Sequence, residues 1–237
     1  MAEMTLVIAD KNYCLWPLPA WLCLSVTKLP FEEVLIRFGQ PDTRAQMLAY
    51  GPTGRVPVLH HNGLVVWDSL AICEYLAELA PEARLWPQDR MARAVARAFS
   101  CEMHALGSYP GSPRKIVFSL DTNVRRRTAP VQPDPEVQEA IDHIVESWTK
   151  LRADHGRNGP FLFGHFTIAD AMSAHLVNRL ATYAISVPDQ ISDYIGAIRA
   201  HPAMAQWIDE ATAEDWTLPS AEKDVSAGRN LRVDSTP

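Results

Sequence analysis

The alternation of apolar and polar positions changes character along the chain. In the first 80 residues, short β-rich runs alternate with helical patterns: strands are expected at 5–9, 31–36, 56–60 and 64–67, and helices at 17–28, 44–50 and 68–80. An Asn-Gly turn at residues 61–63 joins the last two strands as a hairpin. The order β-α-β-α-β-β-α predicts a small mixed sheet covered by helices.

The second half shows almost only helical periodicity. Helices are expected over 90–107, over 134–154, from 167 onward, and after Pro188 and Pro202. Thr167 and Asp170 fit a capping box, so we assign them to folding rather than to catalysis. Residues 108–133 are expected to be a long loop whose Arg125–Arg127 run faces solvent.

Composition places the chain among ordinary globular proteins and excludes several classes. Its 237 residues are 47% hydrophobic, and 22 basic against 28 acidic side chains give a formal net charge of −6. An acidic balance argues against nucleic acid as a partner. No run of about 18 apolar residues suggests a membrane span, and the N-terminus lacks a basic leader, so a cytoplasmic location is expected. The predicted boundaries are a first domain at 4–83, a second at 88–216 and a polar tail at 217–237.

The four cysteines, at positions 14, 23, 73 and 101, do not show the spacing of a metal site. No C-x-x-C pair is present and no histidine stands at ligand spacing, so we expect no metal and reduced thiols. Cys23, Cys73 and Cys101 fall within helical stripes and are interpreted as core residues.

Three motifs, in this order along the chain, resemble the cytosolic glutathione S-transferase family. The run at 54–59 precedes the hairpin, the run at 68–72 opens a helix, and the run at 166–170 caps a helix. The resemblance covers roughly residues 4–216, and the stretch 11–16 is most similar to a bacterial branch related to the zeta and other serine-type classes. It implies an α/β thioredoxin-like N-terminal domain, an all-α helical bundle domain, glutathione as co-substrate and a homodimer.

Two of these motifs have a physical reason to bind a peptide with two charged ends. Between β-rich pieces, Val56-Pro57 suits a cis proline that would expose the Val56 backbone to an extended peptide such as glutathione, with Arg55 beside it. Asp68 and Ser69 open a helix, where a hydroxyl and free amides favour a carboxylate and Asp68 would attract an amino group. Together they match the charges of a γ-glutamyl group, as the resemblance implies.

Cys14 lies after the first strand and just before a helix that starts with proline. Free amides and the helix dipole there predict a lowered thiol pKa. In the family the matching position usually holds the Ser or Tyr whose hydroxyl bonds the glutathione sulfur, so Cys14 departs from that pattern. A thiol is a weaker donor and a better nucleophile, which favours covalent sulfur chemistry, while Tyr13 and Asn12 are possible substitute donors.

The pocket for the second substrate is expected between the two halves. Its candidate residues are Trp16, Met103, His104, Tyr109 and Arg114.

The sequence therefore predicts a glutathione-dependent transferase acting on a small electrophilic or disulfide acceptor. Three alternatives stay open: a glutathione-dependent isomerase or ether-cleaving lyase, a sulfur-transfer enzyme of specialised metabolism, and a non-catalytic binding module of the same fold.

Overall fold

A computed structural model gives the fold and describes residues 4–105, 111–120, 122–125 and 132–221. Its sheet consists of β1 (Met4–Ala9), β2 (Glu32–Ile36), β3 (Val58–His61) and β4 (Leu64–Trp67). The strand order is β2-β1-β3-β4, with β1 parallel to β2 and antiparallel to β3, and with β3 antiparallel to β4. This mixed sheet with its terminal hairpin confirms the predicted order of elements.

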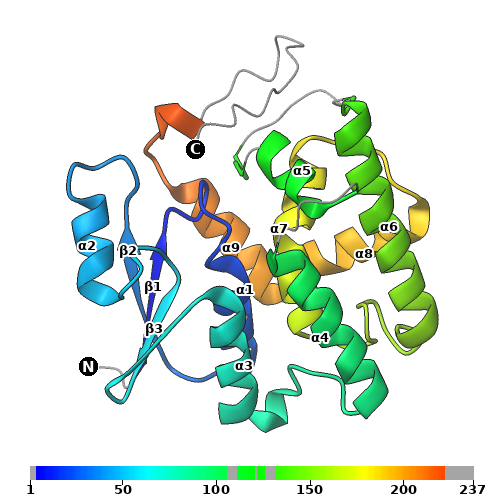
Figure 1. The fold of residues 1–237 in the computed structure, drawn as a ribbon, viewed down its shortest axis with the longest axis horizontal. Helices are drawn as coiled ribbons and strands as arrows, with labels where there is room; N and C mark the ends of the chain where they lie inside the picture. Colours follow the sequence, from blue (N-terminus) through cyan, green and yellow to red (C-terminus); the bar gives the residue numbers. More distant parts are fainter. Residues whose placement is uncertain (1–3, 106–110, 121, 126–131, 222–237) are drawn as a thin grey trace.

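Three helices accompany the sheet: α1 (Leu18–Thr27), α2 (Thr43–Tyr50) and α3 (Ser69–Leu79). The first seven residues of α1 are all buried, because this helix packs against α3 and also against helices of the second half. A helix that is apolar on every side is typical of such a central position. Figure 1 shows α2 at the outer end of the sheet and α1 and α3 on the side that faces the helical part.

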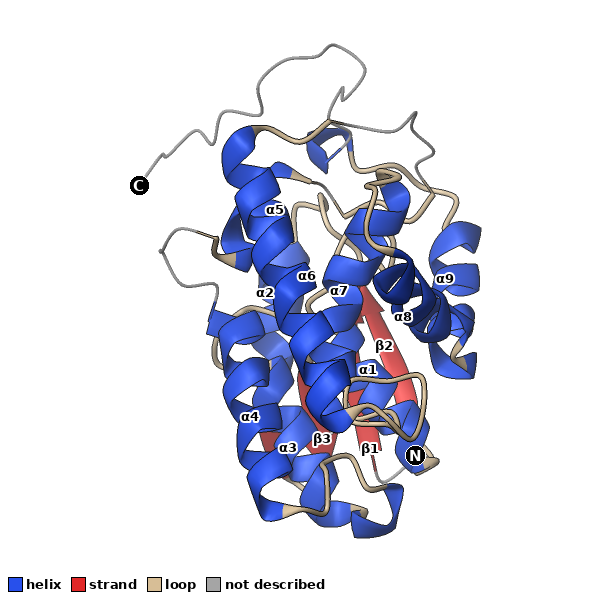
Figure 2. Cartoon of the chain, turned by 90° about the vertical axis from the view of Figure 1, so that its right-hand side faces the viewer, coloured by secondary structure: helices blue, strands red, loops and turns tan. Residues whose placement is uncertain are grey.

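The second half is helical throughout its regular elements in the described ranges. They are α4 (Arg90–Ala105), α5 (Pro113–Ser119), α6 (Pro135–His155), α7 (Ile168–Thr182), α8 (Asp189–Ala200) and α9 (Pro202–Ala213). Single 3₁₀ turns, η1 (Pro81–Ala83) and η2 (Pro219–Ala221), follow α3 and α9. Viewed from the helical side, the strands lie behind these helices (Figure 2).

Helix α5 lies within the segment that the sequence predicts to be a loop. Ser112 caps it by accepting the Arg114 N–H at 3.2 Å, and Pro113 occupies the first turn. Seven residues are too few for a clear apolar period, so the helical prediction failed here.

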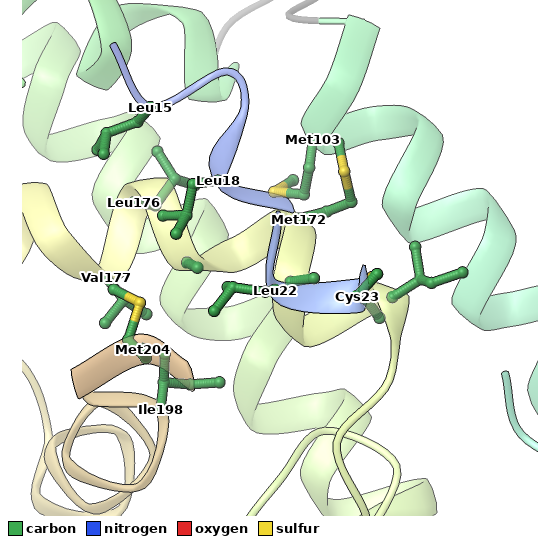
Figure 3. Packing of buried hydrophobic residues seen from close by; sticks show 14 of the residues in the cluster. Leu15, Leu18, Leu22, Cys23, Met103, Met172, Leu176, Val177, Ile198 and Met204 are labelled. Atoms are coloured by element: carbon green, nitrogen blue, oxygen red, sulfur yellow. The ribbon is translucent and has the colours of Figure 1, made fainter. Parts of the chain in front are cut away.

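One continuous core joins the sheet side to the helical part. Leu18, Leu22 and Cys23 of α1 pack with Met103 of α4 and Leu176 of α7, as Figure 3 shows. A second, smaller cluster lies on the α2 side of the sheet and includes Cys14. The two halves therefore share buried surface rather than being joined only by a linker.

The capping box of α7 is present as predicted. The buried Asp170 carboxylate accepts the Thr167 N–H at 2.8 Å and the Thr167 hydroxyl at 2.9 Å. It also accepts the Leu162 N–H at 3.0 Å and the Tyr194 hydroxyl at 3.2 Å. Four donors on one buried carboxylate identify Asp170 as a structural centre of the helical part.

After α9 the chain returns to the sheet (Figure 1). The Trp216 indole donates to Asp10, whose other oxygen accepts the Phe38 N–H at 2.7 Å. The Arg37 guanidinium lies 4.2 Å from the centre of a Trp216 ring. Trp216, the last residue before the predicted polar tail, is therefore held against the sheet side of the molecule, while residues 222–237 lie outside the described residues. None of the described helices is both long enough and apolar enough to cross a membrane.

Candidate functional site

The site is built around the loop between β1 and α1. Cys14 is 6% exposed, and its N–H donates to the Asp10 carbonyl at 2.8 Å. Burial raises the pKa of the Cys14 thiol to about 12, and a hydrogen bond from the Trp16 backbone offsets only part of this rise. The predicted lowering of the thiol pKa is therefore wrong.

The start of α1 explains the difference. The Leu18 N–H is already used, since it donates to the Leu15 carbonyl at 3.2 Å. Pro19 is the second helical residue and has no N–H. Few free amides remain to stabilise a thiolate, so burial dominates at Cys14.

Residues far along the chain fix the same loop. The Glu214 carboxylate accepts the Lys11 N–H at 2.6 Å and the Asn12 N–H at 3.0 Å. The Arg125 N–H donates to the Asn12 side-chain oxygen at 3.1 Å, and its guanidinium donates to the Tyr13 hydroxyl at 2.8 Å. Arg125 is thus held at the loop and does not simply face solvent as predicted; Arg126 and Arg127 lie outside the described residues.

The Val56-Pro57 peptide bond is cis, as the sequence predicts. Val56 and Pro57 precede β3 and line a cavity of about 600 Å³. Cys14 and Trp16 lie on the wall of the same cavity, and Trp16 is 37% exposed. The Val56-Pro57 segment and the Cys14 side chain therefore line one cavity.

The N-terminus of α3 completes this wall. Asp68 is the N-cap, with φ at 81°, and its Oδ1 accepts the N–H groups of Leu70 at 3.0 Å and Ala71 at 3.3 Å. Ser69 is buried and lines the cavity. A hydroxyl beside a helix N-terminus suits a carboxylate ligand.

His104 reaches the cavity from α4. Its Nε2 lies 2.9 Å from Asp68 Oδ2, so the two halves of the chain meet in an ion pair at this point. The interaction with Asp68 raises the pKa of His104. Burial acts to raise the pKa of Asp68, but the hydrogen bond and charge of His104, together with the N–H groups of Ala71 and Leu70, lower that pKa overall.

The structure brings most of the predicted site residues together. The cavity is lined by Cys14, Trp16, Phe38, Met47, Thr53, Gly54, Arg55, Val56, Pro57, Trp67, Asp68, Ser69 and His104. The sequence prediction did not include Phe38, Met47, Thr53, Gly54 or Trp67. Adjacency to Arg55 and Asp68 could have identified Gly54 and Trp67, whereas nothing local marks Phe38 or Met47.

Other predicted residues lie elsewhere. Among the described lining residues, Tyr13 does not occur, and its hydroxyl accepts from Arg125. Met103 is fully buried in the core, and Arg114 is exposed on α5 and is not among the described lining residues. The described wall of the cavity therefore does not include these three predicted residues. Tyr109 lies outside the described residues.

The remaining cysteines divide by exposure. Cys23 and Cys73 are fully buried, as predicted, in α1 and α3. Cys101 is exposed on α4, so the prediction that it packs in the core is wrong. Over the residues that the structure describes, no group of three potential metal ligands converges.

Comparisons with known proteins agree with this geometry. Residues 13–79 match the family model for the glutathione S-transferase N-terminal domain. Over 111 residues the chain is 30% identical to a probable maleylacetoacetate isomerase of Caenorhabditis elegans, covering 47% of this chain and 50% of that protein. It is 33% identical over 103 residues to the maleylacetoacetate isomerase of Rattus norvegicus, covering 42% of this chain and 46% of the relative. These matches span about half the length of the relatives.

A solved structure extends the likeness of the fold to nearly the whole chain. A glutathione transferase homologue from Burkholderia, with bound glutathione, superimposes with a TM-score of 0.63 at 22% identity and covers 89% of this chain and 98% of that one. The family match therefore assigns residues 13–79 to a glutathione S-transferase N-terminal domain, and the solved structure shows the glutathione S-transferase fold over most of the chain. The predicted fold class, a thioredoxin-like half followed by a helical half, is confirmed.

Proposed function

We propose that the chain is a glutathione-dependent transferase that joins glutathione to a small electrophilic acceptor, with Cys14 beside the glutathione sulfur. One observation carries the proposal: a single cavity is lined by Cys14, by the Val56-Pro57 backbone and by the Asp68-Ser69 helix start. A thiol peptide with a charged γ-glutamyl end fits these three features in one extended pose.

Each part of the cavity has a separate task in this proposal. Ser69 and the first turn of α3 hold the γ-glutamyl carboxylate through a hydroxyl and a positive helix end. Asp68 attracts the α-amino group. The backbone of Val56 pairs with the cysteinyl residue of glutathione, with Pro57 and Arg55 beside it. Trp16 forms part of the wall that meets the acceptor, and His104 lies beside Asp68.

The protonated state of Cys14 decides between two kinds of sulfur chemistry. A thiol with a pKa near 12 stays neutral at pH 7 and donates a weak S–H hydrogen bond to the glutathione thiolate. That thiolate then attacks the electrophilic atom of the acceptor, and the leaving group departs with the bonding electron pair. Thiol exchange instead needs the Cys14 thiolate to attack a disulfide acceptor, which this burial disfavours. Conjugation is therefore preferred over exchange.

Glutathione-dependent isomerisation is the second candidate. It is favoured by the relatives that carry the name maleylacetoacetate isomerase. In such a reaction the glutathione thiolate adds to an activated double bond, rotation follows, and elimination returns the thiolate. Ether cleavage, sulfur transfer and a non-catalytic binding role use the same cavity and are outcomes of the tests below.

We also infer a homodimer. Leu64 and Trp67 on β4 are 47% and 46% exposed, and Met91 and Val95 on α4 are 73% and 40% exposed. Large apolar side chains at such exposure favour a protein contact. Light scattering should give twice the chain mass, and Met91→Glu should shift the equilibrium toward the monomer.

We retain the proposed domain boundaries at 4–83 and 88–216. We also retain a cytoplasmic location, where thiols stay reduced.

The function is tested by calorimetry and turnover on the same set of proteins. The parent chain should bind glutathione and conjugate or isomerise model electrophiles. Cys14→Ser should retain or raise this activity, because a hydroxyl is the better donor, whereas Cys14→Ala should lower it. A mixed disulfide at Cys14, lost in Cys14→Ser together with all activity, would instead establish thiol exchange. Absence of glutathione binding would contradict the proposal.

A further inference from the structure

An ion pair between the two halves stands at the place proposed for the glutathione amino group. His104 Nε2 of α4 is 2.9 Å from Asp68 Oδ2 at the start of α3, and both residues line the cavity. The other ring nitrogen, His104 Nδ1, is buried without a hydrogen-bond partner among the residues described. The Asp68 carboxylate is therefore the principal polar contact of this imidazole.

The carboxylate of Asp68 has little free capacity. Its Oδ1 already accepts two backbone N–H groups, from Leu70 at 3.0 Å and Ala71 at 3.3 Å. Its Oδ2 is the oxygen that faces His104. An ammonium group that binds Asp68 must approach Oδ2, so it meets the imidazole there.

The surroundings of His104 make its charge depend on this one carboxylate. Asp68 is the acidic group that faces it from α3, and its hydrogen bond and charge favour the protonated ring. His175 of α7 interacts electrostatically with His104. Burial and the charge of Arg179 hold the pKa of His175 well below its usual range, so His175 is neutral. On α4 itself, the nearby Glu102 is paired with His143 of α6 at 2.7 Å.

We propose that protonated His104 and the α-amino group of glutathione compete for Asp68, so that a bound γ-glutamyl peptide expels one proton from His104 into solvent. This inference rests on the proposed function, because it takes Asp68 as the partner of the amino group. Two cations beside one carboxylate repel each other at this range. When the ring loses its proton, the negative charge of Asp68 is available to the ammonium group. His104 is then a positioning residue that makes peptide affinity depend on pH.

Linkage fixes the sign and the size of the effect. Below the pKa of His104 the ring is protonated and peptide binding must displace a proton, so affinity rises with pH. The rise is at most about tenfold per pH unit for one proton released, and it ends above the pKa of His104.

The experiment uses isothermal titration calorimetry of the full chain with S-methylglutathione. The methylated sulfur carries no proton, so ionisation of the glutathione thiol cannot contribute. Titrations at pH 6.5 in two buffers with different ionisation enthalpies give the number of protons released. We expect a release between about half and one proton, and an affinity that increases between pH 5.5 and pH 8.

Variants separate this role from a structural one. His104→Gln should release no proton, should bind equally across that pH range, and should bind several-fold more tightly than the parent chain at pH 5.5. His143→Gln is the matched control, since His143 also pairs with a carboxylate but does not line the cavity, and it should behave as the parent. An analogue with hydrogen in place of the α-amino group should release no proton from the parent chain.

The possible outcomes distinguish failure of the proposed competition for Asp68 from failure of the proposed function. Binding without proton release, or weaker binding of His104→Gln at every pH, overturns the competition and leaves the proposed function standing. Failure of S-methylglutathione to bind the parent chain at any pH overturns both.

Discussion

The guanidinium of Arg125 donates to the hydroxyl of Tyr13 over 2.8 Å. The same guanidinium donates to the Trp216 carbonyl at 2.7 Å, so Tyr13 is tied to the segment that follows α9. Cys14, the next residue, lines the cavity while Tyr13 does not. Two adjacent residues of one loop thus serve different purposes: Tyr13 anchors the loop and Cys14 faces the ligand.

Tyr13→Phe should therefore leave the affinity for glutathione within about twofold of the parent value. It should lower the free energy of unfolding by about 0.5 to 1.5 kcal/mol, because one hydrogen bond is lost. Calorimetry and urea denaturation measure the two quantities. A loss of activity with an unchanged unfolding free energy would restore Tyr13 as the donor to the glutathione sulfur.

Ser69→Ala should weaken glutathione binding by about 10- to 150-fold, the equivalent of a charge-assisted hydrogen bond of about 1.5 to 3 kcal/mol. Ser25→Ala is the matched control, since Ser25 bonds the Trp21 carbonyl on α1 outside the cavity. Equal affinities for the two variants in calorimetry would remove Ser69 from the binding site.

Asp170→Ala should destabilise the fold by about 3 kcal/mol or more, because four donors lose a buried acceptor together. Asp134→Ala removes only the cap of α6, where Val137 N–H donates at 2.9 Å, and should cost about 1 kcal/mol. Denaturation midpoints of both variants test this order. A larger loss of stability in Asp134→Ala than in Asp170→Ala would show that Asp170 is not the structural centre of the helical part.

The cysteines should differ in their rate of alkylation. At pH 7 iodoacetamide should modify the exposed Cys101 first and Cys14 slowly, because a buried thiol with a pKa near 12 holds almost no thiolate. Cys23 and Cys73 should react last, since both are fully buried. Mass spectrometry after timed quenching measures the four rates. Fastest modification at Cys14 would show that its pKa is lowered after all.

Local patterns predicted the fold well because each element carries its own signature. The hairpin turn at Asn62-Gly63 and the capping box at Thr167 and Asp170 depend on near neighbours in sequence, and the structure has both. Helix α5 was missed because its seven residues are shorter than two full apolar periods.

The site was predicted less completely, since its electrostatics depend on distant residues. Nothing near Cys14 in the sequence indicates that it is buried, and the proline that starts the next helix had suggested only free amides at a helix start. The contact of His104 with Asp68 joins positions 36 residues apart, a distance that no local pattern encodes. The sequence predicted His104 as a pocket residue, but only the structure identifies Asp68 as its partner.

The most direct test of the central claim is a crystal structure of this chain with bound glutathione. The account predicts the γ-glutamyl carboxylate at Ser69, the cysteinyl backbone at Val56, and the glutathione sulfur within about 4 Å of Cys14 Sγ. Glutathione bound outside this cavity, or bound within it with its sulfur directed away from Cys14, would contradict the account.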